Sequence, residues 1–258
     1  MLQLNGSTYT PLERSAYSRI VECINLPKNS DRLTEDRIVC GEYCIAVLDG
    51  VSQGADTNRI LGLTPGAYAV RSGAETFLSL SREFKVNPHT LAHTLARELS
   101  ERLARDAPSY RGFLPSFVFA AYFPREKLIV RVGDCSIRFA GELVSDTVAR
   151  NPLLKVDLVR ADCRSYGKDP GRAWQLTHEN NATSPLGYGC ITPRSLVPAT
   201  LVDIFHVDSH RSIVLASDGY PPHALRDTLH ATEAHYTFFK ASEKSSLHLD
   251  DRTYVRVE

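Results

Sequence analysis

Four aspartates in this 258-residue chain lie where a short apolar run begins or ends, and they constrain the fold more than any other feature. Asp49 and Asp218 each end an apolar run with the pattern of a strand. Asp36 and Asp250 each precede such a run. Carboxylates that gather at one rim of a sheet repel one another, and they stay ionised together when hard divalent cations bind between them. The pattern therefore predicts a metal centre at the rim of a β-sheet.

Each of these acids also has a simpler interpretation. Asp-Gly, found at residues 49–50 and 218–219, is a common way to end a strand in a turn. For any single acid the turn interpretation stays open, and it is the joint pattern that favours a metal centre.

The order and spacing of five short motifs resemble those of the metal-dependent serine/threonine protein phosphatases, the PPM or type 2C family, in a minimal bacterial form. The motifs are Thr-Glu-Asp-Arg at 34–37, Val-Leu-Asp-Gly at 47–50, Val-Gly-Asp-Cys at 132–135, Ala-Ser-Asp-Gly at 216–219 and Asp-Asp-Arg-Thr-Tyr-Val at 250–255. The resemblance implies hydrolysis of phosphomonoesters, and specifically dephosphorylation of phosphoserine and phosphothreonine proteins by a water that two metal ions activate. The implied partner is a phosphoprotein substrate in a signalling role.

The resemblance also implies a role for each acid. The implied catalytic and metal-binding residues are Asp36, Asp49, Gly50 through its carbonyl oxygen, Asp218 and Asp250. Asp49 is expected to bridge the two ions. Glu35 and Asp251 are expected to act behind the ligands or through water. Asp134 is a candidate ligand of a third, weaker metal, and a turn role for it is equally open. Mg²⁺ and Mn²⁺ are the ions that suit a site made only of oxygen ligands.

Members of the family usually hold the substrate phosphate with an arginine shortly before the first acid. Arg32 lies one residue away from that spacing, and Lys28 is a second candidate. The sequence Asn-Ser-Asp-Arg at 29–32 is an alternative match for the first motif. Asp36 is preferred because Glu35 precedes it and because the chain from there to Asp49 forms one clean hairpin.

The main rival interpretation is a phosphatase-like domain that binds a phosphorylated partner without hydrolysing it. The departure of Arg32 from the usual spacing favours this rival, and the presence of all four acids opposes it. The cysteine-phosphatase motif Cys-x5-Arg occurs at none of the six cysteines. A Gly-x-Ser-x-Gly nucleophile turn is also absent.

Composition limits the remaining function classes. Thirty basic and thirty acidic residues give no net charge, which offers no support for nucleic-acid binding. The chain has no apolar run long enough for a membrane span and no leader pattern at its start, so a cytoplasmic protein is expected. The cysteines lack Cys-x-x-Cys spacing and are interpreted as reduced core residues. Oligomeric state is left open.

The patterns predict one α+β domain over residues 1–258, a four-layer α-β-β-α sandwich of two antiparallel sheets flanked by helix pairs. Residues 36–49 form the expected hairpin, with its turn at 41–42. Further strands are expected at 116–123, 127–132, 136–144, 201–207, 212–216 and 253–257, and helices at 65–84, 88–106 and 222–241. Residues 151–198 show a less regular pattern.

Overall fold

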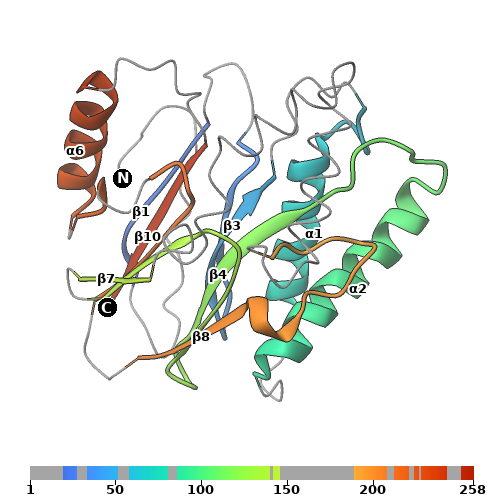
Figure 1. Ribbon diagram of the computed structural model, residues 1–258, viewed down its shortest axis with the longest axis horizontal. Helices are drawn as coiled ribbons and strands as arrows, with labels where there is room; N and C mark the ends of the chain where they lie inside the picture. The colour runs from blue at the N-terminus through green and yellow to red at the C-terminus, as the bar shows by residue number, and fades with distance from the viewer. Residues whose placement is uncertain are drawn as a thin grey trace.

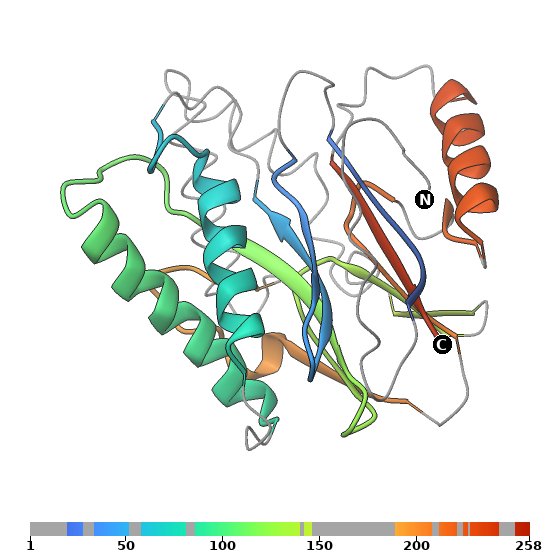
Figure 2. The same ribbon diagram turned by 180° about the vertical axis from the view of Figure 1, so that it is seen from behind.

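The computed structural model describes residues 20–27, 34–51, 58–80, 86–139, 142–145, 189–207, 212–220, 224–226, 228–242 and 251–258. This part of the chain forms two five-stranded antiparallel sheets that lie face to face, with helices on the outer faces (Figures 1 and 2). The predicted α+β class and the paired antiparallel sheets are confirmed.

The two sheets are built from different parts of the chain. Sheet I contains, in spatial order, β2 (Arg37–Cys40), β3 (Ile45–Gly50), β4 (Phe117–Phe123), β5 (Leu128–Val132) and β8 (Val202–His206). Sheet II contains β1 (Ile20–Leu26), β10 (Arg252–Val257), β9 (Ile213–Ala216), β6 (Ser136–Phe139) and β7 (Glu142–Ser145). The chain crosses from sheet I to sheet II at Gly133, where φ is +93° and an added Cβ would overlap Val118. Only glycine fits this crossing.

Helices α1 (Pro65–Leu78) and α2 (Pro88–Asp106) cover the outer face of sheet I, and α6 (Leu229–Ser242) lies against sheet II (Figure 1). Local sequence explains where the first two helices begin. The Thr64 hydroxyl accepts a hydrogen bond from the Ala67 amide at 3.2 Å, and the Asn87 side chain accepts from two amides of the first turn of α2. Proline occupies the first position of both helices, which suits its fixed φ.

The buried apolar residues form three clusters in the described part of the chain. The first fills the space between sheet I and the helix pair, and it includes Leu48, Phe77 and Leu95. The second lies between the two sheets, with Val47 and Leu215 as members from opposite sides. The third lies between sheet II and α6. The acid-bearing strand ends are therefore held by apolar packing on both sides of each sheet.

Three expected elements differ from the observed ones. Helix α1 was expected to reach residue 84 but ends at Leu78, where the Ser79 amide bonds back to the carbonyl of Glu75 and so closes the last turn. The third helix was expected from residue 222 but begins at Leu229, because the Thr228 hydroxyl caps it by accepting from the Ala231 amide at 3.3 Å.

The expected strand at 136–144 is instead a hairpin of two strands, β6 and β7, in sheet II. It does not extend the meander of sheet I as expected, because the chain changes sheets just before it. Strand β1 was not predicted at all, although it pairs with β10 along its length. Residues 151–188, most of the less regular segment, lie outside the described residues.

Candidate metal centre

Asp36 and Asp49 lie on the hairpin formed by β2 and β3. Arg37 pairs with Leu48, so the same register one residue further places Asp36 opposite Asp49. Asp36 is buried, with 4% of its surface exposed, and Asp49 is half-buried. Both acids therefore come from the same end of sheet I, as the hairpin prediction requires.

Asp134 and Asp218 come from sheet II. Ser136 pairs with Ala216 at the end of β6 and β9, and Asp134 and Asp218 each lie two residues beyond that pair. Asp218 is exposed and Asp134 is half-buried. Both acids therefore lie just beyond the same end of sheet II.

The two pairs meet around one buried thiol. Burial raises the pKa of Cys135 well above its ordinary value, and the negative charges of Asp49, Asp134, Asp36 and Asp218 raise it further. One sulfur atom therefore lies within electrostatic range of four carboxylates from both sheets. The strand-end pattern predicts that Asp36, Asp49, Asp218 and Asp250 converge on one metal site, and that site stays a prediction.

The carboxyl group of Asp36 has a strongly raised pKa. Burial raises its pKa to about 7, and the negative charge of Asp251 adds to the rise, while hydrogen bonds with Ser217, Asp49 and Thr253 oppose it. Its Oδ2 atom is buried and meets no hydrogen-bond donor among the described residues. An orphaned buried carboxylate oxygen is costly unless a proton or a cation satisfies it.

A hydrogen-bond network supports the acids from behind. Asp251 is buried, and its Oδ2 accepts the amide hydrogen of Glu35. Asn25, on strand β1, donates to the Asp36 carbonyl at 3.3 Å and accepts from the Thr253 hydroxyl at 3.1 Å. The network links β1, β10 and the segment before β2.

Two other glycines let backbone segments approach the site closely. A Cβ added at Gly50 would lie 2.8 Å from the Glu35 carbonyl oxygen and 2.9 Å from the Gly66 carbonyl carbon. Gly66 is in the first turn of α1, so the positive end of that helix dipole lies beside the acid-bearing end of β3.

Some predicted site residues cannot be placed. Asp250, Arg32 and Lys28 lie outside the described residues, as does the alternative motif at 29–32. Among the residues that are described, no three His, Cys, Asp or Glu side chains are positioned to hold a metal ion together. The described carboxylates are therefore gathered near one another without forming a complete ligand shell.

Sequence reasoning missed three contributors to this site. Ser217 and Thr253 were part of quoted motifs but were given no role, and Asn25 lies on the strand that was not predicted. The two hydroxyl residues directly follow or precede apolar runs, as the acids do, and that shared position was the available signal. For Asn25 the sequence offers no comparable signal.

The fold has solved relatives. The chain aligns with the serine/threonine phosphatase PstP/Ppp of Mycobacterium tuberculosis at a TM-score of 0.57 and 14% identity, covering 93% of this chain and 98% of that one. It aligns with the PstP catalytic domain in complex with two manganese ions at 0.54 and 14%, covering 93% and 97%. The serine/threonine phosphatase Stp1 of Staphylococcus aureus gives 0.54 and 14%, covering 97% and 98%.

Comparisons of sequence alone are less informative. No protein-family model matches the chain, and no curated protein matches it. No helix in the described part of the chain is long and apolar enough to cross a membrane. At 14% sequence identity, the likeness to these solved structures establishes the fold alone. The chain has the fold of the PPM-type serine/threonine phosphatases.

Proposed function

We propose that this protein is a metal-dependent phosphomonoester hydrolase that dephosphorylates phosphoserine and phosphothreonine proteins. The observation that carries the proposal is the position of Asp36, Asp49, Asp134 and Asp218 at or just beyond strand ends of a phosphatase fold, where their negative charges all act on the buried Cys135 thiol. A structural role alone does not require four carboxylates within electrostatic range of one another, because their mutual repulsion is destabilising.

The residues fit a hard divalent cation. The gathered side chains offer carboxylate oxygens, and Asp36 Oδ2 is a buried acceptor that meets no donor among the described residues. Asp36, Asp49, Gly50, Asp218 and Asp250 would hold two Mg²⁺ or Mn²⁺ ions. Ions bound there would supply an activated water nucleophile and positive charge against the phosphoryl oxygens. One solved structure of the same fold, the PstP catalytic domain, contains two manganese ions.

The protein residues have separate tasks in this proposal. Asp251 holds the Glu35 amide, and Asn25 holds the backbone at Asp36 by donating to its carbonyl oxygen. Glu35 and Asp251 support the ligands, and Asp134 is the candidate ligand for a third ion. Arg32 or Lys28 would bind the substrate phosphate, and only arginine can do so with two parallel hydrogen bonds.

The proposal is tested by turnover of p-nitrophenyl phosphate and of a phosphothreonine peptide by the purified protein. We expect hydrolysis with Mn²⁺ or Mg²⁺ and none with EDTA. Asp49→Asn should serve as the inactive control prepared in parallel, because it preserves side-chain shape and removes one charge from the site.

Two other outcomes would reject the proposal. Turnover that persists in EDTA and in Asp49→Asn would place the chemistry elsewhere. Absence of turnover with every metal, combined with retained binding of the phosphopeptide, would favour the non-catalytic phosphopeptide-binding domain.

A further inference from the structure

One residue just after the Ser-Asp-Gly motif and one residue inside the last acid motif contact the same side chain on α6. Tyr220 follows Ser-Asp-Gly at 217–219, and Arg252 follows Asp251 at the start of β10. Tyr220 donates its hydroxyl hydrogen to Glu233 Oε1, and Arg252 Nη1 donates to Glu233 Oε2 at 3.4 Å. One carboxylate therefore joins both segments to the helix. We call Glu233, Tyr220 and Arg252 the Glu233 clamp.

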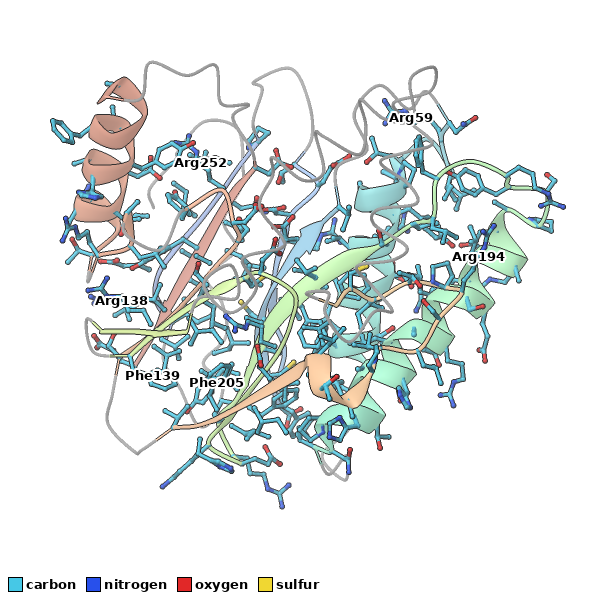
Figure 3. All side chains as sticks on the ribbon, in the orientation of Figure 1. Arg59, Arg138, Phe139, Arg194, Phe205 and Arg252 are labelled. Carbon is cyan, nitrogen blue, oxygen red and sulfur yellow. The ribbon has the colours of Figure 1, made fainter. Side chains whose placement is uncertain are left out.

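The clamp is largely shielded from solvent. Tyr220 is fully buried, and the side chains of Arg252 and Glu233 are 21% and 29% exposed. The Arg252 guanidinium carbon lies 4.6 Å from the centre of the Tyr236 ring, and Tyr236 packs edge-on against Tyr220 with ring centres 5.5 Å apart. Figure 3 shows Arg252 between β10 and α6. Charge-assisted hydrogen bonds and aromatic packing in such an environment restrict each partner to one orientation.

The two clamped segments are also in direct backbone contact. A Cβ added at Gly219 would overlap the Asp251 carbonyl oxygen. The Ser217 hydroxyl accepts from the Thr253 amide at 3.0 Å, and the Ser217 amide donates to the Thr253 carbonyl at 2.9 Å. Because the segments move together, one anchor on α6 fixes the positions of both.

We propose that Glu233 is a positioning residue for the metal centre: it holds the Asp218 segment and the Asp251 segment in the geometry that binds metal. This inference rests on the proposed function. The proposed role of Glu233 is not that of a ligand, since its two oxygens accept from Tyr220 and Arg252. Its effect is transmitted through the backbone of residues that lie next to the acids.

The first test needs no metal. Hydrogen exchange of the EDTA-treated protein is followed in the wild type, Glu233→Gln and Glu233→Ala. We expect exchange at residues 217–220 and 251–253 to accelerate at least about tenfold in Glu233→Ala, because the anchor that suppresses local opening is lost. Glu233→Gln keeps one acceptor oxygen and should be intermediate. If Glu233→Ala fails to fold, Tyr220→Phe removes one clamp bond with a smaller change in volume.

A matched control lies one residue away on the same helix. The buried Thr232 hydroxyl accepts from the Arg226 amide at 3.2 Å and donates to the Thr228 carbonyl at 2.9 Å, and neither partner belongs to an acid segment. Thr232→Val should lower the melting temperature without accelerating exchange at 217–220 and 251–253. Equal acceleration in Thr232→Val and Glu233→Ala would mean that Glu233 only stabilises α6, and the inference would be wrong.

The second test measures metal binding directly by calorimetric titration with Mn²⁺. We expect about a tenfold weaker affinity in Glu233→Ala, the lower end of the range for residues that orient metal ligands, and no change in Thr232→Val. At saturating Mn²⁺ the KM for p-nitrophenyl phosphate should be unchanged, since the clamp does not touch substrate.

Failure of this inference is distinguishable from failure of the proposed function. Wild-type protein that binds no Mn²⁺ and hydrolyses nothing would reject the proposed function, while the exchange measurement would still decide whether Glu233 positions the two segments. Wild-type Mn²⁺ binding that Glu233→Ala retains in full would reject the role of Glu233 alone.

Discussion

Asp36 combines full burial with a carboxylate oxygen that accepts no hydrogen bond among the described residues, and this makes the metal-free protein sensitive to pH. Its ordinary pKa of 3.8 is raised to about 7 by burial and by Asp251. The folded protein therefore keeps a proton that the unfolded chain has lost between these two values. The protonated Asp36 carboxyl makes its full contribution to the free energy of unfolding below pH 3.8. That contribution is lost as the pH rises through about 7.

We therefore expect the free energy of unfolding in EDTA to fall as pH rises from about 4 to about 7. Asp36→Asn should flatten this part of the profile, because amide protonation does not change there. Urea unfolding at a series of pH values measures the effect. Mn²⁺ should oppose the fall, since it satisfies the ionised carboxylate in place of the proton. An Asp36→Asn profile as steep as the wild type would assign the pH dependence to another group.

Asp49 and Asp218 supply charge from opposite sheets, so neither can replace the other. Asn in either position keeps the shape and removes a formal charge, and turnover with Mn²⁺ should fall by at least about 100-fold, equivalent to roughly 2.7 kcal/mol of barrier. The matched control is Asp106→Asn, the same chemical change at the end of α2, on the outer face of sheet I. Steady-state kinetics that show near-normal rates in both site variants would move the chemistry away from these acids.

At the scale of elements, the end of β9 and the start of β10 meet at Gly219. Gly219→Ala should force the two segments apart, because the added Cβ would overlap the Asp251 backbone. We expect a loss of stability at the upper end of the roughly 1–3 kcal/mol typical of overpacking, together with weaker Mn²⁺ binding. Gly41→Ala is the control, since its Cβ would be 3.5 Å from the nearest atom, an ordinary contact. Denaturant titration of both variants tests the difference, and equal stabilities would contradict it.

The sequence predicted helices and strands best where the residues that define them are close together in the chain. The α2 helix was predicted at its observed bounds because leucines recur every four residues on its buried face, and the Asn87 side chain caps it at the expected start. Strand β1 was missed because its pairing with β10 joins residues more than 200 positions apart, and no local pattern reports such a contact. The proline at 222 predicts an earlier start for α6, whereas the observed helix begins at Leu229 and Thr228 caps it.

In the candidate site, too, residues with a local sequence signal were predicted and residues that depend on distant contacts were not. The acids were found because each lies at the end or the beginning of an apolar run, which is a local signal. The clamp residue Glu233 was not found, since its two partners are 13 and 19 residues away along the chain and belong to different strand ends. Only the folded arrangement brings them together.

At the scale of the whole molecule, a buried ion pair connects the crossing between the sheets to the edge of sheet I. The Arg131 side chain is fully buried, and its Nη2 and Nε atoms donate to Asp203 Oδ2 at 2.7 and 3.1 Å. Its Nη1 atom donates to the Cys135 carbonyl at 3.1 Å, beside the gathered carboxylates. The guanidinium thus links β5, the edge strand β8 and the turn that carries Asp134.

Removing one partner of this pair should cost far more than replacing both. Asp203→Leu leaves the Arg131 charge buried without its carboxylate, and we expect a loss of about 3 kcal/mol or more in the free energy of unfolding. Arg131→Met combined with Asp203→Leu leaves no buried charge and should recover most of that loss. Urea unfolding of the wild type, both single variants and the double variant completes the cycle.

The Cys135 carbonyl still loses its donor in the double variant, so metal affinity should stay below the wild-type value even where stability recovers. Full recovery of both quantities would show that Arg131 contributes only stability and does not position the Asp134 turn.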